Sequence, residues 1–240
     1  MNSGLKQIRI GAICLAGLLP AWAQDGPRGH WSGSVEIPNM SLAMDLDLDK
    51  TASGWIGTVS IPAQNATGIP LDGIAFANGK WTFHIKGAPG DPTFTATLAT
   101  DGKSMAGDFT QGPGSFPFKF TRTGDPKIEE SKPSPALSAE FLGTWEGTLE
   151  GPGLRLALKM SNEGGIAKAV LVSLDQGGVE IPASTISQNA SKLTVSVKMV
   201  GGLYEAEINK DGSELNGTWT QGGTGLPLKL KKAASQDKKL

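Results

Sequence analysis

The chain has 240 residues and carries 22 basic and 23 acidic side chains, so its charges nearly cancel. It lacks the basic excess with which nucleic-acid-binding domains contact phosphates, so no nucleic-acid partner is expected. The 33 glycines and 15 prolines are typical of a protein built from short strands and turns. A single cysteine excludes an internal disulfide framework.

Residues 1–23 have the three parts of an export signal. Lys6 and Arg9 give a positive start, residues 10–19 are apolar, and Ala21-Trp22-Ala23 is a small-x-small cleavage site. The apolar stretch is shorter than the ~20 residues that span a bilayer. We therefore expect no membrane span, and a secreted or periplasmic protein after cleavage of this segment near Ala23.

A lipid anchor on Cys14 is the alternative to ordinary cleavage. The residue before it is Ile13, where a lipidation site has a small residue. Ordinary cleavage is therefore favoured, and the mature chain then contains no cysteine.

The rest of the chain repeats one pattern twice. Residues 101–112 align with 211–222 at an offset of 110, Ile69-Pro70 matches Ile181-Pro182 at 112, and Trp31 matches Trp145 at 114. The drift in offset indicates small changes in loop length, which surface loops tolerate. The repeat predicts two tandem domains.

The domain boundaries follow from composition. We place the first repeat at 24–123 and the second at 140–232. A proline-rich linker joins them at 124–139, and a charged tail follows at 233–240.

Apolar and polar residues alternate along each copy, as in Leu42, Met44, Leu46 and Leu48, and this period of two predicts strands with one face on a core. The strands expected in the first copy are 31–37, 42–48, 55–61, 71–76, 81–86, 94–100, 106–110 and 116–121. Those expected in the second are 144–149, 154–160, 167–174, 184–187, 193–199, 204–209, 217–220 and 226–231. Asn78-Gly79, Asp101-Gly102 and Asp211-Gly212 are hairpin signals.

We therefore expect an all-β protein made of two small antiparallel up-and-down β-barrels, with β-sandwiches as the alternative. A meander of this size protects its edges by closing on itself, so that the last strand pairs with the first. Pro117 and Pro227 fit poorly in a central strand. They mark either a bulge or a point where closure is incomplete.

The shared motifs carry a resemblance to a known family. In the second copy they are Trp145-Glu146-Gly147, Ile181-Pro182 and Asn216-Gly217-Thr218-Trp219-Thr220-Gln221-Gly222. The pattern resembles the non-catalytic N-terminal β-domain that precedes the α/β-hydrolase domain in some secreted bacterial serine hydrolases. It also resembles, more weakly, calycin barrels of the lipocalin and avidin type.

The resemblance implies an accessory module and carries over no catalytic residue. No G-x-S-x-G nucleophile elbow is present, and the chain ends soon after Leu230, so no hydrolase domain is expected. The only histidines, His30 and His84, both lie in the first copy, so any Ser-His-Asp chemistry would be confined to one repeat. We expect no catalytic residue and no cofactor.

Asp45, Asp47 and Asp49 alternate with apolar residues and suggest a calcium site, because D-x-D-x-D opens an EF-hand loop. The glycine that such a loop needs next is replaced by Lys50. We therefore expect a solvated strand face and no metal. The matched residues Arg155, Ala157, Lys159 and Ser161 of the second copy are partly basic, which suggests that the two faces meet different partners or have drifted apart.

The candidate ligand-binding residues are Trp31, Trp145, Gln111, Gln221 and Trp219. Their repetition favours core packing for the tryptophans and turn stabilisation for the glutamines. A ligand at the barrel ends is the alternative, because small barrels can hold one.

These features together predict a secreted, non-enzymatic accessory or binding protein whose partner is a small apolar ligand or another secreted protein. A structural protein without a ligand cavity and a component associated with a serine hydrolase are the alternatives.

Overall fold

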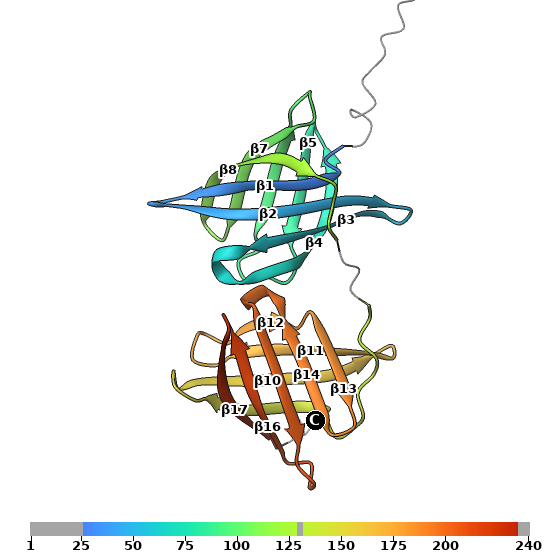
Figure 1. Ribbon diagram of the computed structural model, residues 1–240, viewed down its shortest axis with the longest axis vertical. Helices are drawn as coiled ribbons and strands as arrows, with labels where there is room; N and C mark the ends of the chain where they lie inside the picture. The colour runs from blue at the N-terminus through green and yellow to red at the C-terminus, as the bar shows by residue number, and fades with distance from the viewer. Residues whose placement is uncertain (1–25, 129–131, 235–240) are drawn as a thin grey trace, which may run out of the picture.

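The computed structural model describes residues 26–128 and 132–234. The predicted export signal lies outside these residues. Two all-β units follow one another along the long axis of the molecule, the first formed by β1–β8 and the second by β9–β17 (Figure 1). Within the described ranges, no helix is long and apolar enough to cross a membrane.

The first unit is a closed barrel, here called the first barrel, in which each strand is antiparallel to the next and β1 pairs with β8. Its strands are β1 (Gly29–Ile37), β2 (Met40–Thr51), β3 (Gly54–Ile61), β4 (Ala66–Ala77), β5 (Lys80–Ile85), β6 (Thr93–Leu98), β7 (Ser104–Gln111) and β8 (Gly114–Gly124). A short 3-10 turn, η2 (Pro62–Gln64), precedes β4. The up-and-down barrel expected for this copy is confirmed, with a strand at each predicted position.

The second unit is a nine-stranded antiparallel sheet curled into a half-barrel, here called the second sheet. Its strands are β9 (Gly143–Leu149), β10 (Leu154–Glu163), β11 (Ile166–Ser173), β12 (Val179–Pro182), β13 (Thr185–Asn189), β14 (Lys192–Val197), β15 (Gly202–Ile208), β16 (Glu214–Gln221) and β17 (Thr224–Lys232). A 3-10 turn, η3 (Lys198–Val200), joins β14 to β15.

The additional strand arises because the counterpart of β4 is split. Strands β12 and β13 are the two ends of the sheet order, yet only Ala183 and Ser184 separate them in the chain. The amide of Ala183 donates to the carbonyl of Ala169 on β11, and the amide of Ser184 donates to that of Ser196 on β14. The chain thus passes from one end of the curled sheet to the other within two residues, where the first barrel has one continuous strand.

Each unit has its own hydrophobic core. In the first barrel, the Phe94 ring lies at the centre of an aromatic cluster, with ring centroids 4.7 to 6.2 Å from those of Phe83, Phe109, Phe118 and Phe120. These side chains fill the interior, in which every one of them is 5% exposed or less.

The second sheet places Tyr204 at the position of Phe94. Its hydroxyl donates to the carbonyl of Leu228 at 3.0 Å, so the added polar atom is satisfied inside the core. Burial raises the pKa of this hydroxyl, because the charged phenolate would lose its hydration.

Trp31 and Trp145, which occupy the same repeat position, have no exposed surface. Each indole N–H donates at 2.8 Å to the carbonyl of the residue four positions earlier. A cation from the last strand covers each ring: Arg122 lies 4.9 Å from the Trp31 centroid, and Lys232 lies 5.1 Å from that of Trp145. The packing role expected for these tryptophans is confirmed, and it ties the first strand of each repeat to the last.

The glycine of each Trp-x-Gly motif lies where the first strand meets the last. A Cβ atom on Gly33 would lie 2.0 Å from the carbonyl oxygen of Lys119 on β8. One on Gly147 would lie 2.0 Å from that of Lys229 on β17. Only glycine allows the two backbones to approach this closely.

Pro117 and Pro227 mark the ends of the seams between first and last strands. β8 pairs with β1 only from Phe118 onward, and β17 pairs with β9 only from Leu228 onward. Each proline therefore lies just outside the paired region, where its missing N–H removes no bond to the first strand. Neither expectation for these prolines is met, because the first strand pairs with the last in both units and the pairings of β8 and β17 show no register shift at either proline.

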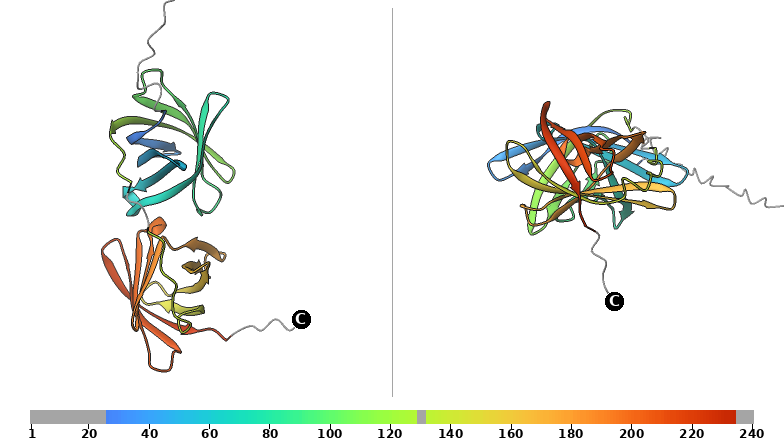
Figure 2. Two further views of the ribbon diagram at one scale, coloured as in Figure 1. Left: turned by 90° about the vertical axis from the view of Figure 1, so that its right-hand side faces the viewer. Right: turned by 90° about the horizontal axis from the view of Figure 1, so that it is seen from below.

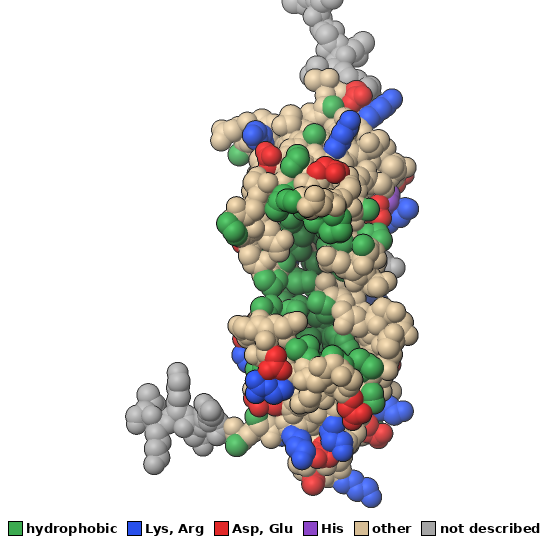
Figure 3. Space-filling model, turned by 90° about the vertical axis from the view of Figure 1, so that its left-hand side faces the viewer, with side chains coloured by type: hydrophobic (Ala, Val, Ile, Leu, Met, Phe, Trp, Pro, Cys, Tyr) green, Lys and Arg blue, Asp and Glu red, His purple; other side chains and the backbone are tan. Residues whose placement is uncertain are grey.

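The two units contact each other through equivalent parts of the repeat. Gly87 follows β5 and abuts Pro182, so that a Cβ atom on this glycine would lie 2.6 Å from the proline ring. Met199 follows β14, packs against the core of the first barrel and shares a cleft with Pro70. Because Gly87 matches Met199 and Pro70 matches Pro182, the two contacts are reciprocal, as in an isologous interface. Figure 2 shows the units end to end, and Figure 3 shows hydrophobic side chains continuing across the junction.

Gly33→Ala and Gly147→Ala should each destabilise the protein by about 3 kcal/mol, since the added methyl group has no space beside a backbone carbonyl. Gly124→Ala is the matched control, because a Cβ there meets no atom within 4 Å. Urea denaturation measures the difference. Equal stability of Gly33→Ala and Gly124→Ala would show that the close approach of β1 and β8 is not required.

Candidate functional site

Three aromatic side chains gather in a cleft on the first barrel, here called the aromatic cleft. The planes of the Trp55 and Trp81 rings lie at 76° with centroids 5.0 Å apart, and the Phe76 centroid lies 5.1 Å from that of Trp81. The cleft has a volume of about 430 Å³. Its other lining residues are Gly26, Lys50, Gly79, Leu98, Ala99, Thr100 and Gly102.

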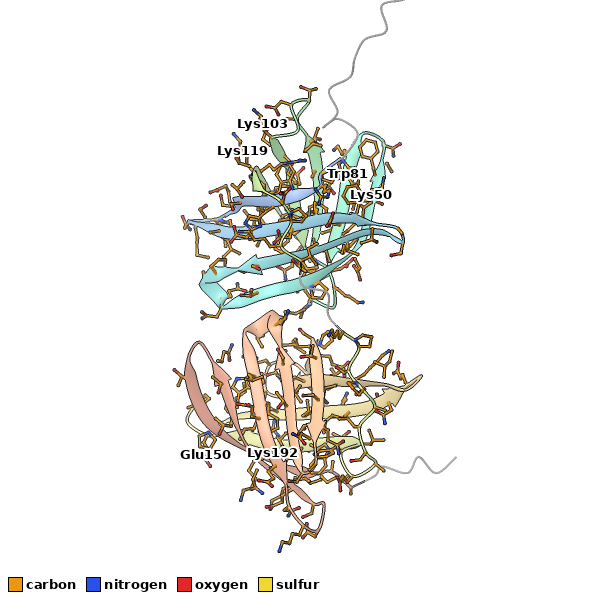
Figure 4. All side chains as sticks on the ribbon, turned by 45° about the vertical axis from the view of Figure 1, so that its right-hand side comes forward. Lys50, Trp81, Lys103, Lys119, Glu150 and Lys192 are labelled. Atoms are coloured by element: carbon orange, nitrogen blue, oxygen red, sulfur yellow. The ribbon has the colours of Figure 1, made fainter. Side chains whose placement is uncertain are left out.

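Two neighbouring hairpins bring these side chains together. Trp55 opens β3 opposite Lys50 on β2, whose ammonium lies 5.8 Å from the ring centroid. Phe76 and Trp81 face each other across the β4–β5 hairpin, which turns at Asn78 and Gly79. Both turn residues have positive φ, as a two-residue hairpin of the I′ type requires, so the Asn-Gly signal explains this geometry. Trp81 and Lys50 lie near each other in the upper part of the first barrel (Figure 4).

The aromatic cleft is open to solvent. Phe76 is 58% exposed, although a large apolar side chain ordinarily gains free energy by burial. Trp55 and Trp81 are half-buried. Exposed groups of apolar side chains are a common feature of interaction sites, so this cleft is a candidate.

The second copy has no counterpart of this cleft. The positions of Trp55, Phe76 and Trp81 are occupied there by Ala167, Gln188 and Leu193, which have the same strand pairings. The repeat therefore folds without these rings, so their presence in the first barrel is not explained by packing alone.

Sequence reasoning did not single out this group. The signal was available as three aromatic residues found in one copy only, but Trp55 lies on a different hairpin from Phe76 and Trp81. The pairing of β3 with β4 and of β4 with β5 is needed to bring the three rings together.

The five residues proposed from the sequence occupy other places. Trp31, Trp145 and Trp219 are 4% exposed or less and belong to the two cores. The side-chain amide of Gln111 donates to the carbonyl of Pro89, and that of Gln221 donates to the carbonyl of Val200. Gln111 thus holds the loop after β5, Gln221 holds η3 after β14, and the five residues do not converge on one site.

The solvated face expected for Asp45, Asp47 and Asp49 is wrong for Asp47. This residue is 7% exposed, and its Oδ1 accepts hydrogen bonds from His30 Nδ1 and from the backbone amide of Lys127, both at 2.8 Å. The reason is that β1 aligns its own polar residues beside β2 and the start of the linker covers them. Among the described residues, no group of three or more acidic, histidine or cysteine side chains is arranged to hold a metal ion.

The other two aspartates also have partners on or beside β1. Asp45 accepts a hydrogen bond from Ser32 Oγ at 2.8 Å, and Asp49 accepts one from Arg28 Nε at 2.7 Å. A Ser-His-Asp triad would need the serine hydroxyl to donate to the imidazole. Ser32 instead donates to a carboxylate, so the His30–Asp47 pair is not extended into a triad through this serine.

The comparisons with known proteins leave the function open. No protein-family model matches the chain, and no curated protein matches it. Among solved structures, it is similar to a protein of unknown function from the DUF3598 family of Nostoc punctiforme, at 10% sequence identity and a TM-score of 0.25. The match covers 89% of this chain and 98% of that chain.

Replacing Asp47 with alanine should destabilise the first barrel by about 2 kcal/mol, because two donors lose their buried acceptor. Asp125→Ala is the control, since that side chain is 95% exposed. Thermal unfolding followed by circular dichroism compares the two variants. An Asp47→Ala variant as stable as the control would mean that the carboxylate contributes nothing to this packing.

Proposed function

We propose that the protein is a secreted, non-enzymatic binding protein whose aromatic cleft holds a small apolar ligand. The observation that carries this proposal is the solvent-open group of Trp55, Phe76 and Trp81 in one copy and its replacement in the other. The volume of about 430 Å³ falls within the usual range for small-molecule sites.

The geometry of the cleft favours a flat ligand. Trp55 and Trp81 form an edge-to-face pair at 76°, so a planar apolar group can stack on one ring and meet the edge of the other. Lys50 stands beside Trp55 and supplies one cation at the rim. An aromatic or fused-ring ligand, neutral or with one peripheral negative group, satisfies these features best.

A role beside a serine hydrolase is the second candidate. It is supported by the repeated Trp-x-Gly, Ile-Pro and Thr-Gln-Gly motifs, which resemble the non-catalytic N-terminal β-domain of some secreted serine hydrolases. In that role the aromatic cleft would contact the hydrolase or its apolar substrate. An esterase assay on the purified protein tests whether the chain itself is an enzyme, and turnover above the blank would contradict a non-enzymatic role.

The binding proposal is tested by exchanging residues between the copies. The combined variant Trp55→Ala, Phe76→Gln and Trp81→Leu installs the residues of the second copy, which that repeat already accommodates. Its affinity for N-phenyl-1-naphthylamine, a neutral fluorescent apolar probe, should fall about tenfold, which corresponds to about 1.4 kcal/mol of lost ring contacts.

Trp219→Phe is the reciprocal control, because Phe109 occupies the matched position of the first copy. Probe titration by fluorescence should give the unchanged affinity for this variant. The proposed site would be overturned if the combined variant kept its affinity for the probe, or if the combined variant and Trp219→Phe lost affinity equally.

A further inference from the structure

A second cleft lies between the two units, and it differs from the aromatic cleft in chemistry. Its floor is the outer face of β1–β4, and its sides are the start of the linker and η3 of the second sheet. The volume is about 560 Å³. Its charged lining residues are Asp45, Asp47, Lys127 and Lys198, with His30 beside them. It is called the polar cleft here.

Two lysines enter the polar cleft from different parts of the chain. Lys127 belongs to the linker, and Lys198 opens η3. Within residues 26–128 and 132–234, neither ammonium forms an ion pair or hydrogen bond, although the surrounding Asp47 and Asp45 have donors of their own. Two cations without protein partners at one cleft favour an anionic group as ligand.

The position of Lys198 is fixed by contacts on both sides of η3. The side-chain amide of Gln221 donates to the carbonyl of Val200 at 2.7 Å. Gly201 adopts φ +59° and approaches Asn65 so closely that a Cβ there would lie 2.4 Å from the Asn65 carbonyl oxygen. The Lys198 ammonium therefore projects over Gly68 of the first barrel, 3.3 Å from where a Cβ on that glycine would be.

The floor of the polar cleft offers hydrogen-bond acceptors and hydroxyls. Asp45 and Asp47 are each bonded through Oδ1, and a carboxylate has room for about four hydrogen bonds, so both retain acceptor capacity. Thr58, Ser60 and Thr67 add hydroxyls that donate and accept. Such a floor suits a ligand that carries several hydroxyl groups.

The charges select among polar ligands. Two lysines and two aspartates face the same space, so a phosphate would bring its negative charge beside the carboxylates with few hydroxyl groups to donate to them. A neutral sugar would offer the two ammonium groups only hydroxyl oxygens, which are weaker acceptors for a cation than a carboxylate. An acidic sugar meets both conditions, since its hydroxyls donate to the aspartates while its carboxylate lies between the lysines.

We propose that the polar cleft binds an acidic saccharide of the uronic acid class, with Lys127 and Lys198 holding the sugar carboxylate and the β2 aspartates accepting hydrogen bonds from the hydroxyls. The second copy cannot form this site: the positions of Asp45, Thr58 and Ser60 are Ala157, Val170 and Val172 there. The site thus requires both units and the linker, and it is independent of the aromatic cleft.

The test is a titration of the full mature chain with trigalacturonate, followed by isothermal calorimetry. The expected result is saturable binding that weakens about tenfold in Lys127→Met and in Lys198→Met. Maltotriose should bind at least tenfold more weakly, and inorganic phosphate at equal concentration should not displace the acidic trisaccharide.

Lys86→Met is the matched control, because Lys86 is the first-copy counterpart of Lys198 and lines a different cleft. Its affinity for trigalacturonate should equal that of the unmodified protein. All three variants should keep the melting temperature and the N-phenyl-1-naphthylamine affinity, so that loss of the polar cleft is distinguished from failure of the aromatic cleft. Absence of binding, equal losses in Lys86→Met, or displacement by phosphate would overturn the proposal.

Discussion

The close approach of the last strand to the first, at Gly33 in one repeat and Gly147 in the other, is the constraint on which the rest of the structure depends. A carbonyl oxygen of β8 or β17 lies where a Cβ of any other residue would be. This contact lets the first strand pair with the last, and it puts the cation of Arg122 or Lys232 over the tryptophan two residues before the glycine. The motif Trp-x-Gly is shared because it joins the ends of each repeat.

The residues that differ between the two copies lie mainly on the outer surface. The pairing of the first strand with the last and the apolar inner faces already define the fold, so the outward-facing residues are free to differ. Two groups of these differences form clefts. One is the aromatic cleft, where Trp55, Phe76 and Trp81 replace smaller or more polar residues. The other is the polar cleft, which depends on the reciprocal contact between the units because Lys198 reaches it from the second sheet. The tandem arrangement thus creates a surface between the two units in addition to the second unit itself.

The strands and their order could be predicted from the sequence, because alternation with a period of two and the Asn-Gly and Asp-Gly turns are local signals. The split of β12 from β13 could not, since Val179–Pro182 is short and has no alternating pattern distinct from that of β13. The burial of Asp47 also escaped prediction. Its alternation with leucines places it on the outer face, but only the tertiary structure shows that His30 and the Lys127 amide cover that face. Both clefts combine residues from several strands, so no pattern of spacing within one segment of the sequence predicts them.

The tryptophans of residues 26–128 and 132–234 divide into a buried set, Trp31, Trp145 and Trp219, and the two rings of the aromatic cleft, Trp55 and Trp81. Fluorine NMR of residues 24–240 labelled with 5-fluorotryptophan observes each of them separately, with assignments from single replacements by phenylalanine. On saturation with N-phenyl-1-naphthylamine, the resonances of Trp55 and Trp81 should shift while the other three stay in place. The account separates a structural framework that both copies share from a binding surface that only the first copy has. If the resonance of Trp31 or Trp145 shifted while those of Trp55 and Trp81 stayed in place, this separation would be contradicted.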